Sequence, residues 1–415
     1  MRIIYITGCL PYGPAEAFLV DEIREMLRGN QVLVVPRSPG KLGRHGACLA
    51  PYTRRENLFS LQVLKHALGV LLSKPRRVVA AAQVLLRSRS VGVALRNVAV
   101  LPKALWLAAL ATQWKADHIH CHWAGTTATM AMIASELSGV PWSLTAHRSD
   151  IVSNNLLAEK ARSATLVRTI SEDGRTMMIA RGVKPDAKLQ VLPMGVRIPN
   201  VIRLNRPEPA VVLCPADLLE VKGHRFLFQA WKLLIERGIT AQLWLAGEGE
   251  LRASLEAAVR ELRIRDSVTF LGTIQHDDLL SLYKAGSISL VALASVDLGR
   301  GCHEGLPVAL VEAMSYGIPV IATATGGIPE LVQPGTGLLV PAEDPWGLAG
   351  AIQRVLEDQT LAQCLGRNGH RRVKETRDIK LIVSELESSF RGSVVRCCSQ
   401  DTAATPLSAK PFYTS

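Results

Sequence analysis

Short apolar runs alternate with longer amphipathic stretches along most of the chain. Runs such as Ile3–Thr7 and Val32–Pro36 are apolar almost throughout, which is typical of strands buried on both faces of a parallel sheet. The stretches between them repeat their apolar residues at helical spacing. The alternation predicts an α/β fold in which helices connect parallel strands. The expected strands are Ile3–Thr7, Val32–Pro36, His118–His120, Trp142–Thr145, Thr165–Thr169, Leu189–Leu192, Ala210–Cys214, Gln242–Ala246, Val268–Leu271, Ile288–Leu293, Pro319–Ala322 and Gly337–Val340.

A polar, proline-rich stretch divides this alternation into two halves. Pro199, Pro207 and Pro209 fall within it, a composition typical of interdomain linkers. We expect two doubly wound, Rossmann-like domains over residues 1–198 and 210–375, joined by a linker over 199–209. A helix over 376–393 is expected to pack back on the first domain, and 394–415 to form a disordered tail. Two such domains would present the carboxyl ends of their strands to a common cleft, where open α/β sheets bind ligands.

Composition excludes several classes of protein. The chain has 415 residues, 48% hydrophobic and 20% charged, so it is neither disordered nor fibrous. The most apolar window, Val91–Ala111, contains Arg96 and Lys103, and we expect no transmembrane helix. The opening residues read as a strand rather than a secretory signal. Eight cysteines without a CxxC pair favour a reducing, cytoplasmic compartment over a zinc site or a disulfide framework.

The net charge of +12 is concentrated in residues 51–116, where Glu56 is the only acid. Leu61, Leu64, Leu68, Leu71 and Leu72 recur there at helical spacing. Basic amphipathic helices bind anionic membrane surfaces, so we expect a membrane surface or an anionic acceptor as partner. The alternative is a set of ordinary surface helices packed on a sheet. Nucleic acid is not expected, because no binding motif and few aromatic residues accompany the charge.

The strongest chemical signal is the segment Cys302-His-Glu-Gly-Leu-Pro-Val-Ala-Leu-Val-Glu-Ala-Met314. Pro307 suits the first turn of a helix, and Gly305 lets the backbone approach a ligand closely. The N–H groups from Leu306 onward would form an anion site suited to a diphosphate. Glu304 and Glu312 would lie at different depths of one pocket, where carboxylates can bind sugar and ribose hydroxyls. Two glutamates at this spacing would more often be solvated charges on a helix. The surrounding EGLP and EAM strings make a binding role the better interpretation here.

These strings resemble the retaining nucleotide-sugar glycosyltransferases of family 4 (group 1), in their exopolysaccharide branch of the colanic acid and amylovoran type. The resemblance covers about residues 3 to 390 and is most specific in the second half. The segments that carry it in the second half are Lys222-Gly-His224, Leu243–Gly249, Val268–Gly272, Glu304–Glu312, Gly317-Ile-Pro-Val320, Thr325-Gly-Gly-Ile-Pro-Glu330 and Gly335–Val340. Those in the first half are Gly13-Pro-Ala-Glu16, His118-Ile-His-Cys-His-Trp123 and Pro141–Asp150.

The resemblance implies a GT-B fold with the nucleotide-sugar donor held mainly by the second domain. Lys222 would pair with the donor phosphates, with the backbone of Gly305, Leu306 and Pro307 beside them. Glu312 would bind the ribose and Glu304 the donor sugar. Neither a metal nor a resident cofactor is expected, because cations and helix N–H groups can stabilise the leaving diphosphate.

In the first half, the resemblance assigns Gly13 to a loop approaching the donor. It places His147 beside the anomeric carbon. His120 and His122 are divided equally between acceptor-site and structural roles. A zinc site on His118, His120 and His122 is not expected, since no further ligands have suitable spacing. Front-face attack, with retention and proton transfer to the departing phosphate, is the expected mechanism.

One position departs from the family pattern. Asp217, five residues before Lys222, stands where relatives usually carry an arginine. A carboxylate about 4 Å from a diphosphate would cost about 4 kcal/mol at an effective dielectric of 20. Either another cation (Arg300, Arg225 or His224) replaces the arginine, or Asp217 turns away, or donor binding is impaired.

Three functions therefore remain at this point. The first is transfer of a sugar from a nucleotide-sugar donor to a saccharide acceptor. We expect that acceptor to be lipid-linked and the enzyme to be peripheral at the inner face of the membrane, in surface or exported polysaccharide synthesis. The second is a catalytically weak, glycosyltransferase-like scaffold or partner protein. The third is a sugar-nucleotide epimerase, which would act on the nucleotide sugar without an acceptor.

Overall fold

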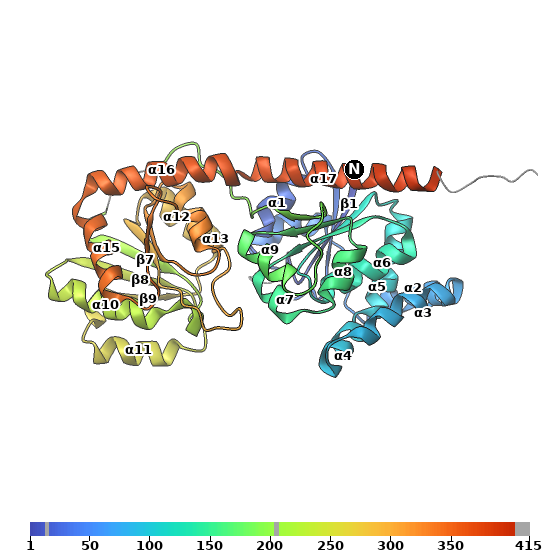
Figure 1. Ribbon diagram of the computed structural model, residues 1–415, viewed down its shortest axis with the longest axis horizontal. Helices are drawn as coiled ribbons and strands as arrows, with labels where there is room; N and C mark the ends of the chain where they lie inside the picture. The colour runs from blue at the N-terminus through green and yellow to red at the C-terminus, as the bar shows by residue number, and fades with distance from the viewer. Residues whose placement is uncertain (13–15, 203–206, 403–415) are drawn as a thin grey trace, which may run out of the picture.

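The computed structural model describes residues 1–12, 16–202 and 207–402, with side chains described up to residue 394. Two α/β domains lie side by side, and two long helices follow one another along one side of the molecule (Figure 1). Each domain is built around one parallel sheet of six strands. The predicted α/β fold with two doubly wound domains is confirmed, and each predicted strand end lies within two residues of the observed one.

The first sheet has the strand order β2-β1-β3-β4-β5-β6. Its strands pair in parallel, and their apolar side chains form the buried cores on both faces of the sheet. The strands are β1 (Arg2–Thr7), β2 (Gln31–Pro36), β3 (His118–His122), β4 (Trp142–Ala146), β5 (Leu166–Thr169) and β6 (Leu189–Val191). Helix α1 (Leu19–Met26) connects β1 to β2, and α6 (Thr126–Ser138) connects β3 to β4. Helices α7 (Arg148–Ser153) and α8 (Leu157–Ser163) lie between β4 and β5, and α9 (Glu172–Ile179) lies between β5 and β6.

The second sheet has the strand order β12-β11-β10-β7-β8-β9. Its strands are β7 (Ala210–Pro215), β8 (Ala241–Ala246), β9 (Val268–Gly272), β10 (Leu290–Leu293), β11 (Val320–Thr323) and β12 (Leu338–Val340). The helices of this domain are α10 (His224–Glu236), α11 (Arg252–Glu261), α12 (His276–Ala285), α13 (Val308–Ser315), α14 (Ile328–Leu331), α15 (Pro345–Glu357) and α16 (Gln359–Arg377).

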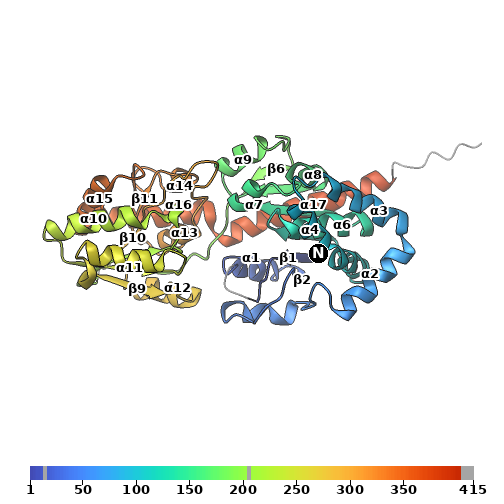
Figure 2. The same cartoon turned by 90° about the horizontal axis from the view of Figure 1, so that it is seen from below.

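The basic region forms the helices between β2 and β3. They are α2 (Leu61–Ser73), α3 (Pro75–Gln83), α4 (Val91–Ala99) and α5 (Leu101–Gln113). Helix α5 is buried against α2 and α6, whereas α2 and α3 lie at the end of the molecule away from the second domain (Figures 1 and 2). In the described chain no single helix is long and apolar enough to cross a membrane; only the pair α4 and α5, bent by 40°, reaches that length and composition together.

The structure changes the picture of the basic region in two ways. Lys103 is one of the basic residues of this region, but it is fully buried and cannot contact a membrane or another partner. The leucines of α2 lie outward instead of on the sheet: Leu61, Leu68 and Leu72 are 83%, 56% and 73% exposed. Val63 and Ala67, on the opposite side of the helix, provide its buried contacts.

The last helix, α17 (Ile379–Thr402), returns to the first domain and packs on α1 and β5. Its Phe390 is fully buried and stacks on the His118 ring with centroids 4.3 Å apart. The helix continues to Thr402, so a disordered tail beginning at 394 was wrong for residues 394–402. These residues contain neither glycine nor proline and extend the helix; the first proline of the tail is Pro406, and residues 403–415 lie outside the described part.

Candidate active site

Lys222 and Glu304 form an ion pair on the second domain. Lys222 ends a short 3-10 helix (Glu220–Lys222) after β7, and its Nζ lies 2.5 Å from Oε2 of Glu304. Ser295 Oγ also donates to this carboxylate, at 3.2 Å. The two predicted residues therefore come together, each partly accessible, with side chains 20% and 12% exposed. In this state the lysine charge is balanced by a carboxylate, which a diphosphate could replace.

Glycine allows the loops to meet at this ion pair. Gly223 has φ +63°, and a Cβ there would lie 1.9 Å from the Ala294 carbonyl oxygen. Gly326 has φ +49°, and a Cβ there would lie 1.8 Å from the Glu304 carbonyl oxygen. Any other residue would force the loops apart, because real Cβ atoms do not approach backbone so closely.

The helix after Glu304 was expected from Leu306 and begins two residues later. Pro307 is the N-cap rather than part of the first turn, with ψ 111°, and α13 starts at Val308. Within the described residues no hydrogen-bond acceptor is found for the Val308 and Ala309 N–H groups, which leaves them for an anion. The Gly305 carbonyl accepts from Gly327 N–H at 3.0 Å, and Leu306 is only 5% exposed, so its side chain belongs to the core.

Glu312 lies one and a half turns into α13 and has a partner that the sequence analysis missed. His276, the first residue of α12, places Nε2 2.6 Å from Glu312 Oε1. Burial lowers the pKa of His276, but the hydrogen bond and charge of Glu312 outweigh it and raise that pKa. His276 Nδ1 is buried with no hydrogen-bond partner among the described residues. His276 begins the helix that follows β9, but a single histidine at a helix start carries no sequence pattern of its own.

His147 stands at the carboxyl end of β4, at the opposite side of the interdomain region. It is the N-cap of α7, and its backbone N–H donates to Asp150 Oδ1 at 2.7 Å. The ring is 8% exposed and packs against Trp123, with ring centroids 4.4 Å apart. Burial and the nearby His122 and Arg168 charges hold the pKa of His147 well below its usual range. The imidazole is therefore neutral at neutral pH, a form that can donate one hydrogen bond and accept another.

His122 belongs to a fully buried polar network behind His147. Its Nδ1 lies 3.4 Å from His147 Nε2, and its Nε2 lies 2.9 Å from Glu22 Oε1. Glu22 also accepts from the Tyr5 hydroxyl and from Arg168 at 2.7 Å. Burial raises the pKa of Glu22, but the Arg168 and His122 charges hold it well below its usual range. The network fixes His122 and, through it, the His147 ring.

His120 is placed inside the sheet rather than toward a ligand. Both ring nitrogens have partners, Ser143 Oγ at 2.7 Å and Thr145 Oγ1 at 3.1 Å. Glu22, His120 and His122 bring potential metal-ligating atoms within 4.8 Å of one another. The ring nitrogens of the two histidines and the Glu22 carboxylate bond to one another and to neighbouring side chains of the protein.

The loop after β1 is shaped by Glu16, another residue whose role the sequence analysis did not identify. Its carboxylate accepts the N–H groups of Gly8, Cys9 and Leu10, and the Trp123 indole N–H. Burial raises the pKa of Glu16, but these hydrogen bonds outweigh it and lower that pKa. Gly13, predicted to approach the donor in this loop, lies outside the described residues.

Asp217 is exposed, and no side-chain partner for it is found in the described chain. Of the cations proposed to replace the missing arginine, His224 does not qualify. It is 2% exposed, and burial with the Lys222 charge lowers its pKa to about 4. Arg225 pairs with Glu220 at 3.5 Å, and Arg300 is exposed on the loop before Glu304.

Direct contacts bring the two halves of the site together. Arg148, next to His147, donates to the Gly301 carbonyl at 2.9 Å. A Cβ on Gly305 would lie 3.4 Å from Arg148 Cβ. Glu330 reaches across to accept the N–H groups of Glu172 and Asp173 at 2.8 and 2.9 Å, at the start of α9. The His147 segment therefore faces the Glu304–Gly305 segment.

Comparison with known proteins identifies the family. Residues 201–372 match the model of glycosyl transferases group 1, and residues 61–195 match that of the glycosyl transferase 4-like domain. The amylovoran biosynthesis glycosyltransferase AmsK of Erwinia amylovora is 29% identical over 225 residues, 51% of this chain and 54% of AmsK. The putative colanic acid glycosyltransferase WcaL of Escherichia coli is 32% identical over 169 residues, 40% of this chain and 41% of WcaL. The matched segments span about half the length of these relatives.

Solved structures share the fold. HepE of Anabaena in complex with UDP-glucose superposes with a TM-score of 0.68 at 19% identity, over 94% of this chain and all of HepE. Sucrose-phosphate synthase of Thermosynechococcus elongatus superposes with a TM-score of 0.65 at 20% identity, over 98% of this chain and all of that one. The two-domain architecture is thus the GT-B architecture of glycosyltransferases. With both of its domains matched, the chain belongs to the group 1 family of glycosyl transferases.

Proposed function

We propose that this protein is a retaining glycosyltransferase that moves a sugar from a nucleotide-sugar donor to a lipid-linked saccharide in the synthesis of a surface or exported polysaccharide. The observation that carries the proposal is the Lys222–Glu304 ion pair beside the start of α13, opposite the His147 segment. The likeness to AmsK and WcaL supports the polysaccharide role. UDP-glucose bound to HepE supports a nucleotide-sugar donor.

In the ligand-free protein Glu304 occupies the place on Lys222 that the donor diphosphate would take. The donor diphosphate would bind to the Lys222 ammonium and to the unpartnered N–H groups at the start of α13. These groups would stabilise the negative charge of the diphosphate as it leaves. Glu304, released from Lys222, would accept hydrogen bonds from the sugar hydroxyls. Glu312 would exchange its His276 partner for the ribose hydroxyls. In this proposal the groups of this chain hold and polarise the donor.

The transfer step follows from these positions. The acceptor oxygen forms a bond to the anomeric carbon as the bond from that carbon to the diphosphate oxygen breaks. In front-face attack the acceptor proton passes to the departing phosphate oxygen. His147, neutral and fixed by His122, would hydrogen-bond the sugar beside the reacting carbon. A sugar covalently attached to Glu304, found by mass spectrometry of a quenched turnover mixture, would overturn this mechanism.

The surface of α2 supports a membrane-bound acceptor. Leu61, Leu68 and Leu72 form an exposed apolar stripe on that helix, and Lys65, Arg76 and Arg77 are exposed near it on α2 and α3. Exposed leucines flanked by cations are typical of helices that lie in the membrane interface. Ordinary surface helices would place the leucines on the sheet instead. We therefore propose peripheral attachment to an anionic membrane.

A panel of ligands tests the donor site. Thermal unfolding would be followed with UDP, GDP, TDP, ADP, CMP and their sugars. A ligand at 100 times its Kd adds about 2.7 kcal/mol to the stability of the folded state. We expect one nucleotide to respond, and the response to be lost in Lys222→Ala but kept in the control Lys232→Ala, an exposed lysine of α10 paired with Glu236.

Asp217 supports a second candidate, a glycosyltransferase-like scaffold with a degenerate donor site. Its carboxylate is exposed where a phosphate-binding arginine is usual, and no cation in the described chain pairs with it. If no nucleotide stabilises the protein and Asp217→Arg restores a response, the scaffold is the better conclusion. A response in the unaltered protein that Asp217→Arg strengthens keeps the transferase.

A further inference from the structure

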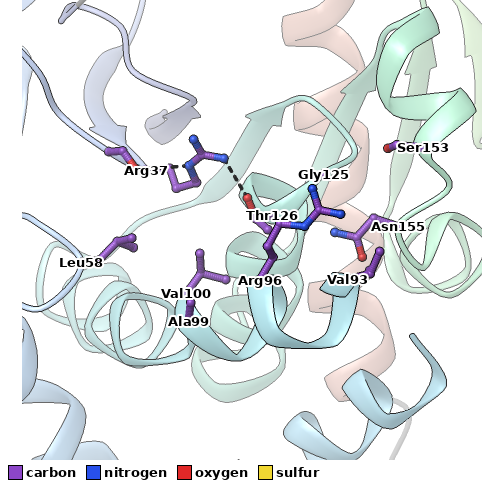
Figure 3. Close-up of a pocket in the computed structure, with 11 residues that line it drawn as sticks. Arg37, Leu58, Val93, Arg96, Ala99, Val100, Gly125, Thr126, Ser153 and Asn155 are labelled. Atoms are coloured by element: carbon purple, nitrogen blue, oxygen red, sulfur yellow. Dashed lines mark hydrogen bonds between the residues drawn. The ribbon is translucent and has the colours of Figure 1, made fainter. Parts of the chain in front are cut away.

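A separate cavity of about 330 Å³ opens in the first domain, between the end of β2, helix α4 and the start of α6 (Figure 3). It has no residue in common with the donor-side groups described above. Its lining includes Arg37, Val93, Arg96, Gly125, Thr126 and Ser153.

Two guanidinium groups give the cavity a positive charge. Arg37 donates to Thr126 Oγ1 at 3.0 Å and to Ser38 Oγ at 3.3 Å, both neutral hydroxyls. Arg96 bonds to the carbonyl of Gly92 in its own helix, at 3.2 Å. Among the described side chains neither arginine has a carboxylate partner, and none of the lining residues is acidic. Figure 3 shows Arg37, the residue after β2, and Arg96 of α4 among the side chains that line the cavity.

The start of α6 adds hydrogen-bond donors on the floor of the cavity. The N-cap of this 13-residue helix is Gly125, which offers no side-chain cap. For the N–H groups of Thr126 and Thr127 the described chain offers no acceptor. These groups and the positive end of the helix dipole favour an anion. The two arginines and the start of α6 thus both favour an anionic ligand.

Two buried lysines hold the walls of the cavity in place. Lys103 Nζ donates to the carbonyls of Pro36, Arg37 and Glu56 at 2.5, 3.0 and 2.6 Å. Lys160 Nζ donates to the carbonyls of Ala124, Gly125 and Asn155 at 2.8, 2.7 and 2.6 Å. Both lysines are fully buried. Each Nζ thereby fixes three carbonyls whose residues line the cavity or lie close to its lining in the chain.

The cavity lies between the His147 segment and the exposed apolar side of α4. His147 caps one end of α7, and Ser153, at the other end, lines the cavity. Six residues of α-helix span about 9 Å, which is the scale of the separation between these two ends of α7. Helix α4 contributes Val93 and Arg96 to the cavity, while Val91, Leu95 and Val98 are 76%, 65% and 53% exposed on its other side.

We infer that this cavity binds a phosphate or diphosphate group, and that the group belongs to the lipid-linked acceptor. A lipid chain lying along the exposed apolar side of α4 would bring its headgroup to Arg96 and Arg37. Arginine suits this ligand, because its planar fork bonds two phosphate oxygens at once. The assignment to the acceptor rests on the proposed transferase function, whereas the anion site itself does not.

Binding can be measured without donor or turnover. Flotation would compare phosphatidylcholine vesicles doped with polyprenyl diphosphate against vesicles that carry the same charge as phosphatidylglycerol. We expect preference for the diphosphate lipid, reduced at least tenfold in the double variant Arg37→Gln/Arg96→Gln. The matched control is Arg76→Gln/Arg77→Gln, which removes two exposed charges of α3 outside the cavity. It should weaken binding to both vesicles equally and keep the preference.

A second arm separates the sources of phosphate. Inorganic pyrophosphate would be added to the full chain in a Lys222→Ala background, where the donor-side lysine no longer competes. Thermal stabilisation that disappears in Arg37→Gln/Arg96→Gln supports the anion site. If that occurs without any vesicle preference, the site takes a soluble phosphate and its assignment to the acceptor is overturned. If both double variants lose the preference equally, or if pyrophosphate stabilises the Arg37→Gln/Arg96→Gln protein as before, the cavity is not the site.

Folding and donor binding provide the remaining controls. A normal melting temperature of the Arg37→Gln/Arg96→Gln protein, and an unchanged response to the donor nucleotide, would show that any loss is local to the cavity. A protein with no nucleotide response but with diphosphate binding that depends on Arg37 and Arg96 would contradict the proposed transferase while retaining the anion site. The two proposals therefore fail separately.

Discussion

At the scale of single residues, both donor-side carboxylates already have a nitrogen partner, Lys222 Nζ or His276 Nε2. Glu304 holds Lys222 at 2.5 Å, and Glu312 holds His276 at 2.6 Å. Each pair would have to open for a nucleotide sugar to bind in the proposed way. The pairs therefore satisfy these partly buried groups in the ligand-free protein, and opening them is a cost that binding must overcome.

The variant Glu304→Gln should separate diphosphate binding from sugar binding. With the carboxylate gone, Lys222 no longer has to leave a partner, so the affinity for the nucleoside diphosphate should rise severalfold. The sugar loses a charged hydrogen-bond acceptor, worth about 1.5–3 kcal/mol, so the additional affinity of the nucleotide sugar should fall at least tenfold. Calorimetric titration with the diphosphate and with its sugar measures both. A parallel fall in the two affinities would contradict the exchange of partners.

The His276–Glu312 pair should make stability depend on pH. Glu312 raises the pKa of His276 in the folded protein above its unfolded value, near 6.5. The pair's contribution is then complete below about pH 6.5 and is lost as the pH rises through the folded-state pKa. His276→Gln should reduce the free energy of unfolding on the order of 1 kcal/mol at pH 5.5 and by less at pH 8.5. Urea unfolding at both pH values tests this, with His66→Gln, a histidine bonded to its own helix backbone, as control.

At the scale of elements, the sequence predicted the strands well and the polar interactions poorly. Parallel strands are apolar on both faces, so runs such as Val320–Thr323 are visible in one dimension. The motif residues Lys222 and Glu304 were found because a family resemblance marks them. His276 was missed, because a single histidine carries no pattern until folding brings it to Glu312. Lys103 was counted as surface charge, since only the fold shows the three carbonyls that bury it.

The exposed stripe of α2 gives a prediction at this scale. The triple variant Leu61→Ser/Leu68→Ser/Leu72→Ser should bind anionic vesicles at least tenfold more weakly, because each exposed leucine loses the apolar area that it would bury in lipid. Its melting temperature should barely change, since the folded protein does not bury these side chains. Vesicle sedimentation measures the binding, and Leu381→Ser, an exposed leucine of α17 (52% exposed), is the control. Equal binding by the two variants would show that α2 does not touch the membrane.

At the scale of the whole molecule, the chain crosses between the domains twice. It passes from the first to the second between β6 and β7, and it returns where α16 gives way to α17 (Figure 1). At the return, Val196 and Asp378 form a β-bridge, so the two crossings lie side by side. The last helix thus completes the core of the first domain, although it follows the whole of the second in sequence.

This arrangement predicts which domain depends on α17. Phe390 is fully buried between the helix and the first sheet, on the rings of His118 and His120. Phe390→Ala should cost the first domain about 3–5 kcal/mol, because truncating a buried aromatic leaves a cavity. Differential scanning calorimetry should show the first-domain transition lowered and the second-domain transition, identified by its shift with donor nucleotide, unchanged. Leu381→Ala is the exposed control. If both transitions fall together, the domains unfold as one unit, and α17 couples the donor site to the acceptor domain instead of serving the first core alone.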